Sequence, residues 1–324
     1  MRICLVTPAP AHSRHGNRVT ALRWAKILRG LGHRVEVAQT YGGRPADLLI
    51  ALHAGKSAGS LRRFRARYPH APVVLALTGT DLYPDLVSTG VAVDVLDLAD
   101  RLVVLQPLGM DQLPASLRER ARVIYQSAGA PPPVPAPAVD VFEAAVIAHL
   151  RPVKDPLLAA AAVRLLPADS TVRVRHAGAA LDRRLGEHAA RESRTNPRYS
   201  WVGELSHLEA RRLLGGCRLL VLTSRHEGGA NVLSEALAAG VPTLASRIPG
   251  SVGILGAGYP GYFPVADAGA LAELMLGAER NTDGFYDELR RRCAALRSLV
   301  DPDGEQQAWT RLLAELNLTP PSKR

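Results

Sequence analysis

The stretch CRLLVLTSRHEGGANVLSEALAAGVP, from Cys217 to Pro242, decides the fold. Its first eight residues, CRLLVLTS, form a short and mainly apolar run that ends in two hydroxyl residues. This run predicts a buried strand. After the paired glycines, apolar residues recur with helical spacing until a glycine and a proline end the pattern. The expected unit is a strand, a glycine loop and a helix. This geometry aims free backbone N–H groups and the positive end of a helix dipole at a ligand above the strand.

The same alternation of strands and helices runs through the whole chain. Apolar runs such as RICLV, DLLIAL and PVVLAL are separated by amphipathic segments, and the series restarts after residue 138 with FEAAVIAHL. This pattern indicates the α/β class, with two doubly wound parallel sheets. The proline-rich stretch GAPPPVPAPA is too stiff for a helix or a central strand. We expect an acceptor domain over 1–130, a linker over 131–138, a donor domain over 139–299, and a C-terminal helix over 300–324 that packs back on the first domain.

Composition excludes several classes of protein. The 324 residues carry a net charge of +10, but only four of the 40 basic residues are lysine, the basic residues are spread along the chain, and aromatics are 5%. Stacking platforms are therefore scarce, and we expect no nucleic-acid partner. No apolar run approaches the roughly 18 residues of a membrane span. The three cysteines have no metal-site spacing, so we expect a reducing, cytoplasmic setting with free thiols.

The segment EGGANVLSEALAAGVP resembles the two-glutamate signature of family 4 retaining glycosyltransferases. The spacing of the glutamates, the glycines and the terminal AAGVP match together. The resemblance implies the GT-B fold, in which two Rossmann-like domains face an interdomain cleft. It also implies that Glu227 acts in catalysis by accepting hydrogen bonds from donor-sugar hydroxyls, and that Glu235 holds both ribose hydroxyls of the nucleotide. The backbone around the glycines would contact the donor, at Gly228, Gly229, Ala230 and Asn231. The alternative for Glu235 is a favourable place near a helix N-terminus, worth about 0.3–1 kcal/mol.

Three further segments match landmarks of that family. In AHLRPVKDP, from Ala148 to Pro156, Lys154 stands where a lysine grips the donor diphosphate. His149 replaces the more usual arginine five positions earlier, and Arg151 is a nearby substitute. In YSWVGEL, Gly203 would let the backbone approach the nucleobase, and Gly16 opens the helix after the first loop. No Asp-x-Asp motif follows a strand, so we expect no required metal and no cofactor, with cations stabilising the leaving diphosphate.

The expected acceptor side is rich in cations. The loops TPAPAHSRHGN, LHAGKSA and LTGTD all follow strands of the first half. Their candidate acceptor-binding residues are His12, Arg14, Arg18, His53, Lys56, Thr78, Thr80 and Asp81. Cations suit a small anionic acceptor better than a lipid or a neutral glycan. These loops resemble the selenosugar synthase branch, which joins selenophosphate to a UDP-sugar. The resemblance implies UDP-GlcNAc or UDP-glucose as donor and a selenosugar product of the selenoneine type.

Three alternatives stay open from the sequence. A family 4 enzyme with an ordinary sugar or sugar-phosphate acceptor would use the same donor residues. A UDP-sugar 2-epimerase shares the architecture and would change a UDP-sugar without any acceptor. A non-enzymatic nucleotide-sugar or nucleic-acid binding module would release no UDP with any acceptor. Fold alone does not choose among these functions.

Overall fold

The computed structural model describes residues 1–84, 86, 88, 90, 91 and 93–318. These residues divide into two compact units. The first unit contains the described residues of Met1–Gln126, Glu227–Asn231 and Pro302–Arg324, and the second contains Ser127–His226 and Val232–Asp301. Each unit is built around one parallel sheet.

The sheet of the first unit has six parallel strands in the order β2-β1-β3-β4-β5-β6. The strands are β1 (Arg2–Val6), β2 (Arg34–Ala38), β3 (Leu48–Leu52), β4 (Val73–Leu77), β5 (Arg101–Val104) and β6 (Ala121–Val123). Strands β3 and β4 are buried along their whole length, as expected where helices cover both faces of a parallel sheet. The strand order reverses between β1 and β3, which is where open α/β sheets bind ligands.

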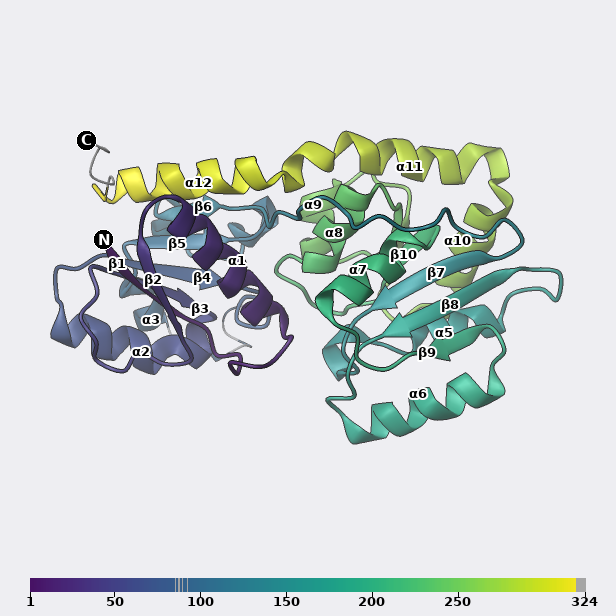
Figure 1. Cartoon of the computed structure of the whole chain (residues 1–324), viewed down its shortest axis with the longest axis horizontal. Coiled ribbons are helices and arrows are strands. Elements are labelled where there is room, and N and C mark those ends of the chain that lie inside the picture. The colour runs from purple at the N-terminus through teal and green to yellow at the C-terminus, as the bar shows by residue number, and fades with distance from the viewer. Residues whose placement is uncertain (85, 87, 89, 92, 319–324) are drawn as a thin grey trace. The chain divides into compact units, whose positions relative to one another are not determined.

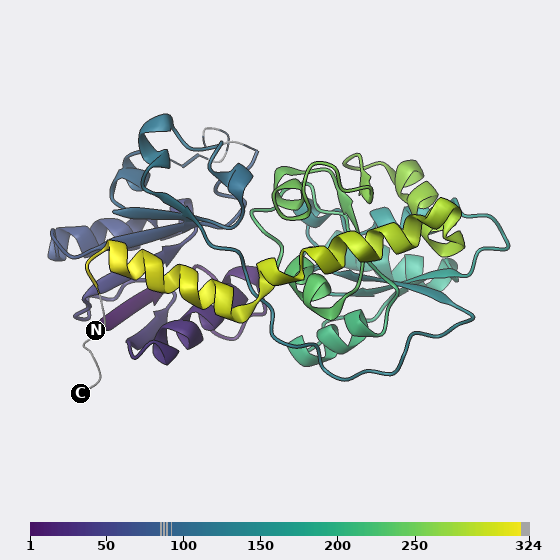
Figure 2. The ribbon, with the colours of Figure 1, turned by 90° about the horizontal axis from the view of Figure 1, so that it is seen from above.

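Helices cover both faces of this sheet. They are α1 (Gly16–Gly30), α2 (Ala54–Arg67), α3 (Val93–Asp97), α4 (Ala115–Arg118) and α12 (Pro302–Glu315), with the short 3-10 helix η1 (Pro107–Gly109). On one face, Trp24 of α1 meets Trp309 of α12 edge to face, with ring centroids 4.9 Å apart. The buried carboxylate of Glu305 accepts a hydrogen bond of 2.7 Å from the Trp24 indole. In both views the C-terminal α12 lies over this sheet (Figure 1, Figure 2).

The sheet of the second unit also has six parallel strands, in the order β12-β11-β10-β7-β8-β9. The strands are β7 (Phe142–Ile147), β8 (Val172–Ala177), β9 (Tyr199–Trp201), β10 (Leu219–Leu222), β11 (Thr243–Ser246) and β12 (Tyr262–Phe263). The helices are α5 (Leu158–Arg164), α6 (Arg183–Thr195), α7 (His207–Gly215), α8 (Asn231–Ala239), α9 (Pro249–Leu255), α10 (Ala268–Arg280) and α11 (Phe285–Ala295), with the 3-10 helices η2 (Pro152–Lys154), η3 (Thr282–Gly284) and η4 (Arg297–Val300). Helices α7 and α8 share a buried cluster with β7 and β10. Residues 124–141, all described, contain no helix or strand.

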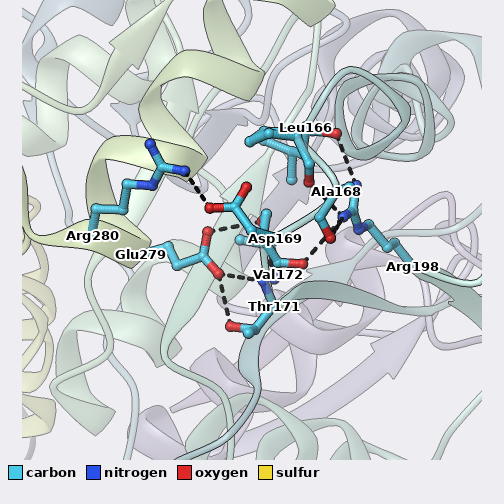
Figure 3. A network of polar contacts seen from close by, with 10 residues as sticks. Leu166, Ala168, Asp169, Thr171, Val172, Arg198, Glu279 and Arg280 are labelled. Carbon is cyan, nitrogen blue, oxygen red and sulfur yellow. Dashed lines mark hydrogen bonds and ion pairs between the residues drawn. The ribbon is translucent and has the colours of Figure 1, made fainter.

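A polar network fixes the connection between α5 and β8 (Figure 3). Arg198 donates hydrogen bonds of 2.6–3.2 Å to the carbonyls of Leu166, Pro167, Ala168 and Ser170. From α10, Glu279 accepts from the hydroxyl and the backbone N–H of Thr171, and Arg280 pairs with Asp169 at 2.9 Å. Arg198 thus satisfies loop carbonyls that would otherwise need water, and Glu279 satisfies the Thr171 N–H.

The predicted α/β class with two doubly wound parallel sheets is confirmed. Short alternating apolar runs became strands because each lies between helices that cover its sheet. The structure adds the two-residue strand β12, whose sequence has too few apolar residues in a row for a strand prediction.

Candidate functional site

The loops that follow β7, β8, β9 and β10 leave the same edge of the second unit's sheet, because the carboxyl ends of parallel strands share one edge. The sequence places His149, Arg151 and Lys154 after β7, and Gly203 after β9. Helix α8, which follows the β10 loop, carries Glu235. The structure therefore brings these five candidate donor residues to one edge of one sheet.

Residues that follow β10 form hydrogen bonds and an ion pair with the loop that contains η2. The Thr223 hydroxyl donates a 2.8 Å hydrogen bond to the Lys154 carbonyl, and the Arg225 backbone N–H donates one of 2.9 Å to the Val153 carbonyl. The Arg225 guanidinium pairs with Asp155 at 2.8 Å. The backbone of Lys154 is thus fixed at the end of η2, and its side chain is half-buried. Sequence analysis missed Thr223 and Arg225, whose only signal is their place directly after a strand.

The β7 and β8 exits are joined through His149. Its Nδ1 accepts a 3.1 Å hydrogen bond from the backbone N–H of Ala179, and the Leu150 N–H donates to the Ala179 carbonyl at 2.9 Å. In a neutral ring whose Nδ1 accepts, the proton lies on Nε2. His149 therefore carries its ring proton on Nε2, on the side of the ring away from the Ala179 contact.

Glu235 has a partner that sequence analysis did not predict. Its carboxylate Oε1 lies 2.8 Å from Nε2 of His207, the first residue of α7. The Glu235 side chain is 13% exposed, whereas that of His207 is 59% exposed. A capping box of Ser206 and Glu209 fixes the start of α7 and so places His207. The contact involves Oε1, one of the two oxygens of the Glu235 carboxylate.

The backbone conformation at position 203 requires a glycine. The φ of Gly203 is +76°, in the left-handed region that side chains disfavour, and its carbonyl accepts a 2.8 Å hydrogen bond from the N–H of Gly178. The β8 and β9 exits are therefore joined by a hydrogen bond between their main chains.

The glycine loop Glu227–Asn231 is part of the first unit. A Cβ on Gly228 would lie 2.6 Å from the Thr78 carbonyl carbon, and one on Gly229 would lie 2.8 Å from Cβ of Leu105. Both positions therefore need glycine for close approach. Asn231 accepts a 2.7 Å hydrogen bond from Arg23 and donates to the Gly16 carbonyl at 3.4 Å. In the first unit the structure thus brings Gly228, Gly229, Asn231, Gly16 and Thr78 together.

Asp81 organises the candidate acceptor loops from inside. It is fully buried, and its carboxylate accepts hydrogen bonds from the backbone N–H groups of Ala54 at 2.8 Å, Thr78 at 2.9 Å and Gly79 at 2.9 Å. One carboxylate thereby ties the β3 exit to the β4 exit. Sequence analysis assigned Asp81 to acceptor binding. In this structure its carboxylate accepts hydrogen bonds from the main chain, and its Oδ2 lies 3.9 Å from Nδ1 of His53.

His53 connects the same two loops and is itself buried. Its Nδ1 accepts a hydrogen bond from the Lys56 N–H at 3.4 Å, so Nε2 carries the proton and faces the Thr80 hydroxyl at 3.2 Å. Burial lowers the pKa of His53, although the nearby Asp81 raises it. The ring is therefore neutral at pH 7. His53 is the N-cap residue of α2, with a φ of 70°.

The remaining acceptor candidates lie on exposed or half-buried parts of the first unit. Lys56 and Thr80 are exposed beside His53, and His12 and Arg14 are exposed on the loop between β1 and α1. Arg18, in the first turn of α1, is half-buried and its Nε has no hydrogen-bond partner among the described residues.

The described residues contain no group of three or more His, Cys, Asp or Glu side chains that could hold a metal ion. Within the same residues, no helix has both the length and the apolar character to cross a membrane.

Comparison with known proteins identifies the second half of the chain. Residues 135–295 match the family model for glycosyl transferases group 1. These residues form a group 1 glycosyltransferase domain. The protein is therefore an enzyme of the glycosyltransferase class. No curated protein matches the sequence of this glycosyltransferase.

Solved structures share the fold of the whole glycosyltransferase. Anabaena HepE in complex with UDP-glucose has a TM-score of 0.77 and 16% identity, covering 98% of this chain and 99% of the other. Sucrose-phosphate synthase from Thermosynechococcus elongatus also has a TM-score of 0.77, with 15% identity over 98% of this chain and 100% of the other. A glycosyltransferase from Rickettsia africae has a TM-score of 0.71 and 14% identity over 98% and 99%. At these identities the likeness shows the GT-B fold of two Rossmann-like domains.

Proposed function

We propose that this glycosyltransferase moves a hexose from a UDP-sugar to a small anionic acceptor, without a metal ion and with retention of configuration. The observation that carries the proposal is the gathering of Glu235, Lys154 and His149 at one edge of the second unit's sheet. A half-buried carboxylate on a helix suits the ribose hydroxyls, and cations on the β7 loop suit a diphosphate. HepE, which shares the fold, was solved with UDP-glucose bound.

The donor would be UDP-glucose or UDP-GlcNAc. Its diphosphate would lie against the Arg151–Lys154 loop, where Lys154, Arg151 and the Nε2–H of His149 offset the charge that develops on the leaving UDP. Glu227 and the glycine loop would contact the sugar. Preorganised cations can carry out this stabilisation without magnesium, because the loop is already fixed by Thr223 and Arg225.

The acceptor would be selenophosphate. The loops of the first unit present Lys56, Arg18 and Arg14, with His53 and Thr80 as neutral hydrogen-bonding groups. Selenium is soft and anionic in this acceptor, so it can attack the anomeric carbon without a strong general base. In that step the C1–Se bond forms as the C1–O bond to the diphosphate breaks, and UDP leaves. A phosphorylated sugar would suit the same cations, which makes acceptor identity the part to test.

The test is a UDP-release assay with UDP-glucose and UDP-GlcNAc, each with selenophosphate, thiophosphate, inorganic phosphate or a sugar phosphate, followed by mass analysis. We expect UDP release and a selenium-bearing sugar with selenophosphate, little product with inorganic phosphate, and the same rate in EDTA. Product with only a sugar or sugar phosphate would overturn the selenophosphate acceptor and keep the transferase. An isomerised UDP-sugar formed without acceptor would instead identify an epimerase.

A further inference from the structure

His176 is a polar residue where the sheet favours an apolar one. It lies near the end of β8, on the strand face that also buries Val172 and Val174, and its side chain is fully buried. Burying an imidazole costs free energy unless both ring nitrogens are paired. Both are paired here. Nδ1 lies 2.7 Å from the Tyr199 hydroxyl, and Nε2 lies 2.9 Å from the Ala148 carbonyl oxygen.

These two partners fix the protonation of the ring. A carbonyl oxygen can only accept, so Nε2 carries a proton and donates it to Ala148. Burial lowers the pKa of His176 to about 4, so at pH 7 the ring is neutral and Nδ1 has a lone pair. The Tyr199 hydroxyl must therefore donate to Nδ1. Only one neutral tautomer satisfies both contacts.

The bond from His176 reaches the point where β7 leaves the sheet. Ala148 directly precedes His149, and its N–H donates to the Ala177 carbonyl at 3.0 Å. On the other side, a Cβ on Gly178 would lie 1.9 Å from the Ala148 oxygen, so the β8 main chain packs directly against that carbonyl. The Ala148 carbonyl is thus hydrogen-bonded by His176 and packed against the main chain at Gly178.

We propose that His176 is a positioning residue for the loop that binds the donor diphosphate. By fixing the Ala148 carbonyl, it sets the direction in which the chain enters the segment carrying His149, Arg151 and Lys154. An apolar residue at this position would satisfy the packing but would leave that carbonyl without its donor. The inference rests on the proposed function, because it assigns the positioned loop to the diphosphate.

The test compares UDP, which has the diphosphate, with uridine, which lacks it. Both are titrated calorimetrically into the wild type, His176→Leu and His176→Gln, whose folding is checked by thermal unfolding. Glutamine keeps amide N–H donors and an acceptor oxygen, whereas leucine has neither. Loss of one aligned phosphate contact should weaken UDP binding by about tenfold or more in His176→Leu. The affinity of the same variant for uridine should change less than about twofold. In His176→Gln, UDP affinity should lie within about threefold of the wild type.

Two results would overturn this inference and leave the proposed function standing. In one, His176→Leu binds UDP as tightly as the wild type does. In the other, His176→Leu loses affinity for UDP and for uridine equally. A wild type that does not bind UDP would overturn the proposed donor and this inference with it. If His176→Leu does not fold, nitrogen NMR of the wild-type imidazole ring tests the inference through the tautomer of His176. The inference requires the Nε2–H tautomer of His176 from pH 5 to pH 8, with signals identified by their loss in His176→Gln, and the opposite tautomer would contradict it.

Discussion

Lys154 is the residue whose role in the chemistry is easiest to separate from its role in the fold. Its backbone is held by Thr223 and lies in η2, and the substitution Lys154→Ala leaves that contact in place. Because charge builds up on the diphosphate as the sugar departs, removing this cation should lower kcat by about 10²–10³, more than it weakens UDP binding. Steady-state kinetics with UDP-glucose or UDP-GlcNAc measure both. Lys26→Ala, an exposed lysine on α1, is the matched control and should leave both unchanged.

Asp81 should matter first for stability. Asp81→Ala leaves the buried N–H groups of Ala54, Thr78 and Gly79 without an acceptor, at about 1–3 kcal/mol each. We expect the free energy of unfolding to fall by about 3 kcal/mol or more, measured by urea denaturation. Asp94→Ala removes only an exposed pair with Arg62, so it should cost less than about 1 kcal/mol. Equal losses in both variants would contradict the organising role of Asp81.

At the scale of single elements, the connection between α5 and β8 depends on one planar side chain. Arg198→Lys should fail to rescue Arg198→Met, because an ammonium cannot reach four carbonyls that a guanidinium fork spans. We expect both variants to lose about 2 kcal/mol of stability in urea denaturation. Arg194→Met changes an exposed arginine on α6 and is the control. Full stability of Arg198→Lys would show that charge, and not the fork geometry, holds the loop.

The elements themselves were largely predictable from the sequence, whereas their side-chain pairings were not. Alternating apolar runs and the paired glycines are local patterns, and they predicted the strand, loop and helix around Glu235. The His207–Glu235 contact joins residues 28 positions apart, and Asp81 meets a peptide 27 positions away. Such contacts depend on how strands order in the sheet, which periodicity does not encode. The roles of the individual candidate residues stay predictions.

At the scale of the whole molecule, buried histidines should make the protein sensitive to mild acid. Burial lowers the pKa values of His176, His53 and His33. The unfolded chain therefore binds more protons than the folded one below about pH 6.5, and stability falls as pH falls. With a pKa of about 4 when folded and 6.5 when unfolded, His176 alone should remove about 2 kcal/mol between pH 7 and pH 5.

Urea denaturation of the wild type and His176→Gln at pH 7 and pH 5 measures that dependence. The variant should lose less stability over this interval, by about the same 2 kcal/mol. The carboxylates whose pKa values neighbouring arginines lower, such as Asp47 and Glu315, titrate below this window, so they do not obscure the comparison. Identical pH dependence in both proteins would contradict a neutral, buried His176.

The central claim is that the second unit binds a nucleotide sugar through Glu235, and calorimetric titration of UDP into the wild type and Glu235→Ala tests it most directly. Two charge-assisted hydrogen bonds to the ribose are worth about 1.5–3 kcal/mol each, so the variant should bind UDP at least about 100-fold more weakly. Its thermal unfolding should be unchanged, since the substitution removes a contact with the exposed side chain of His207. Wild-type affinity for UDP in a folded Glu235→Ala variant would contradict the account.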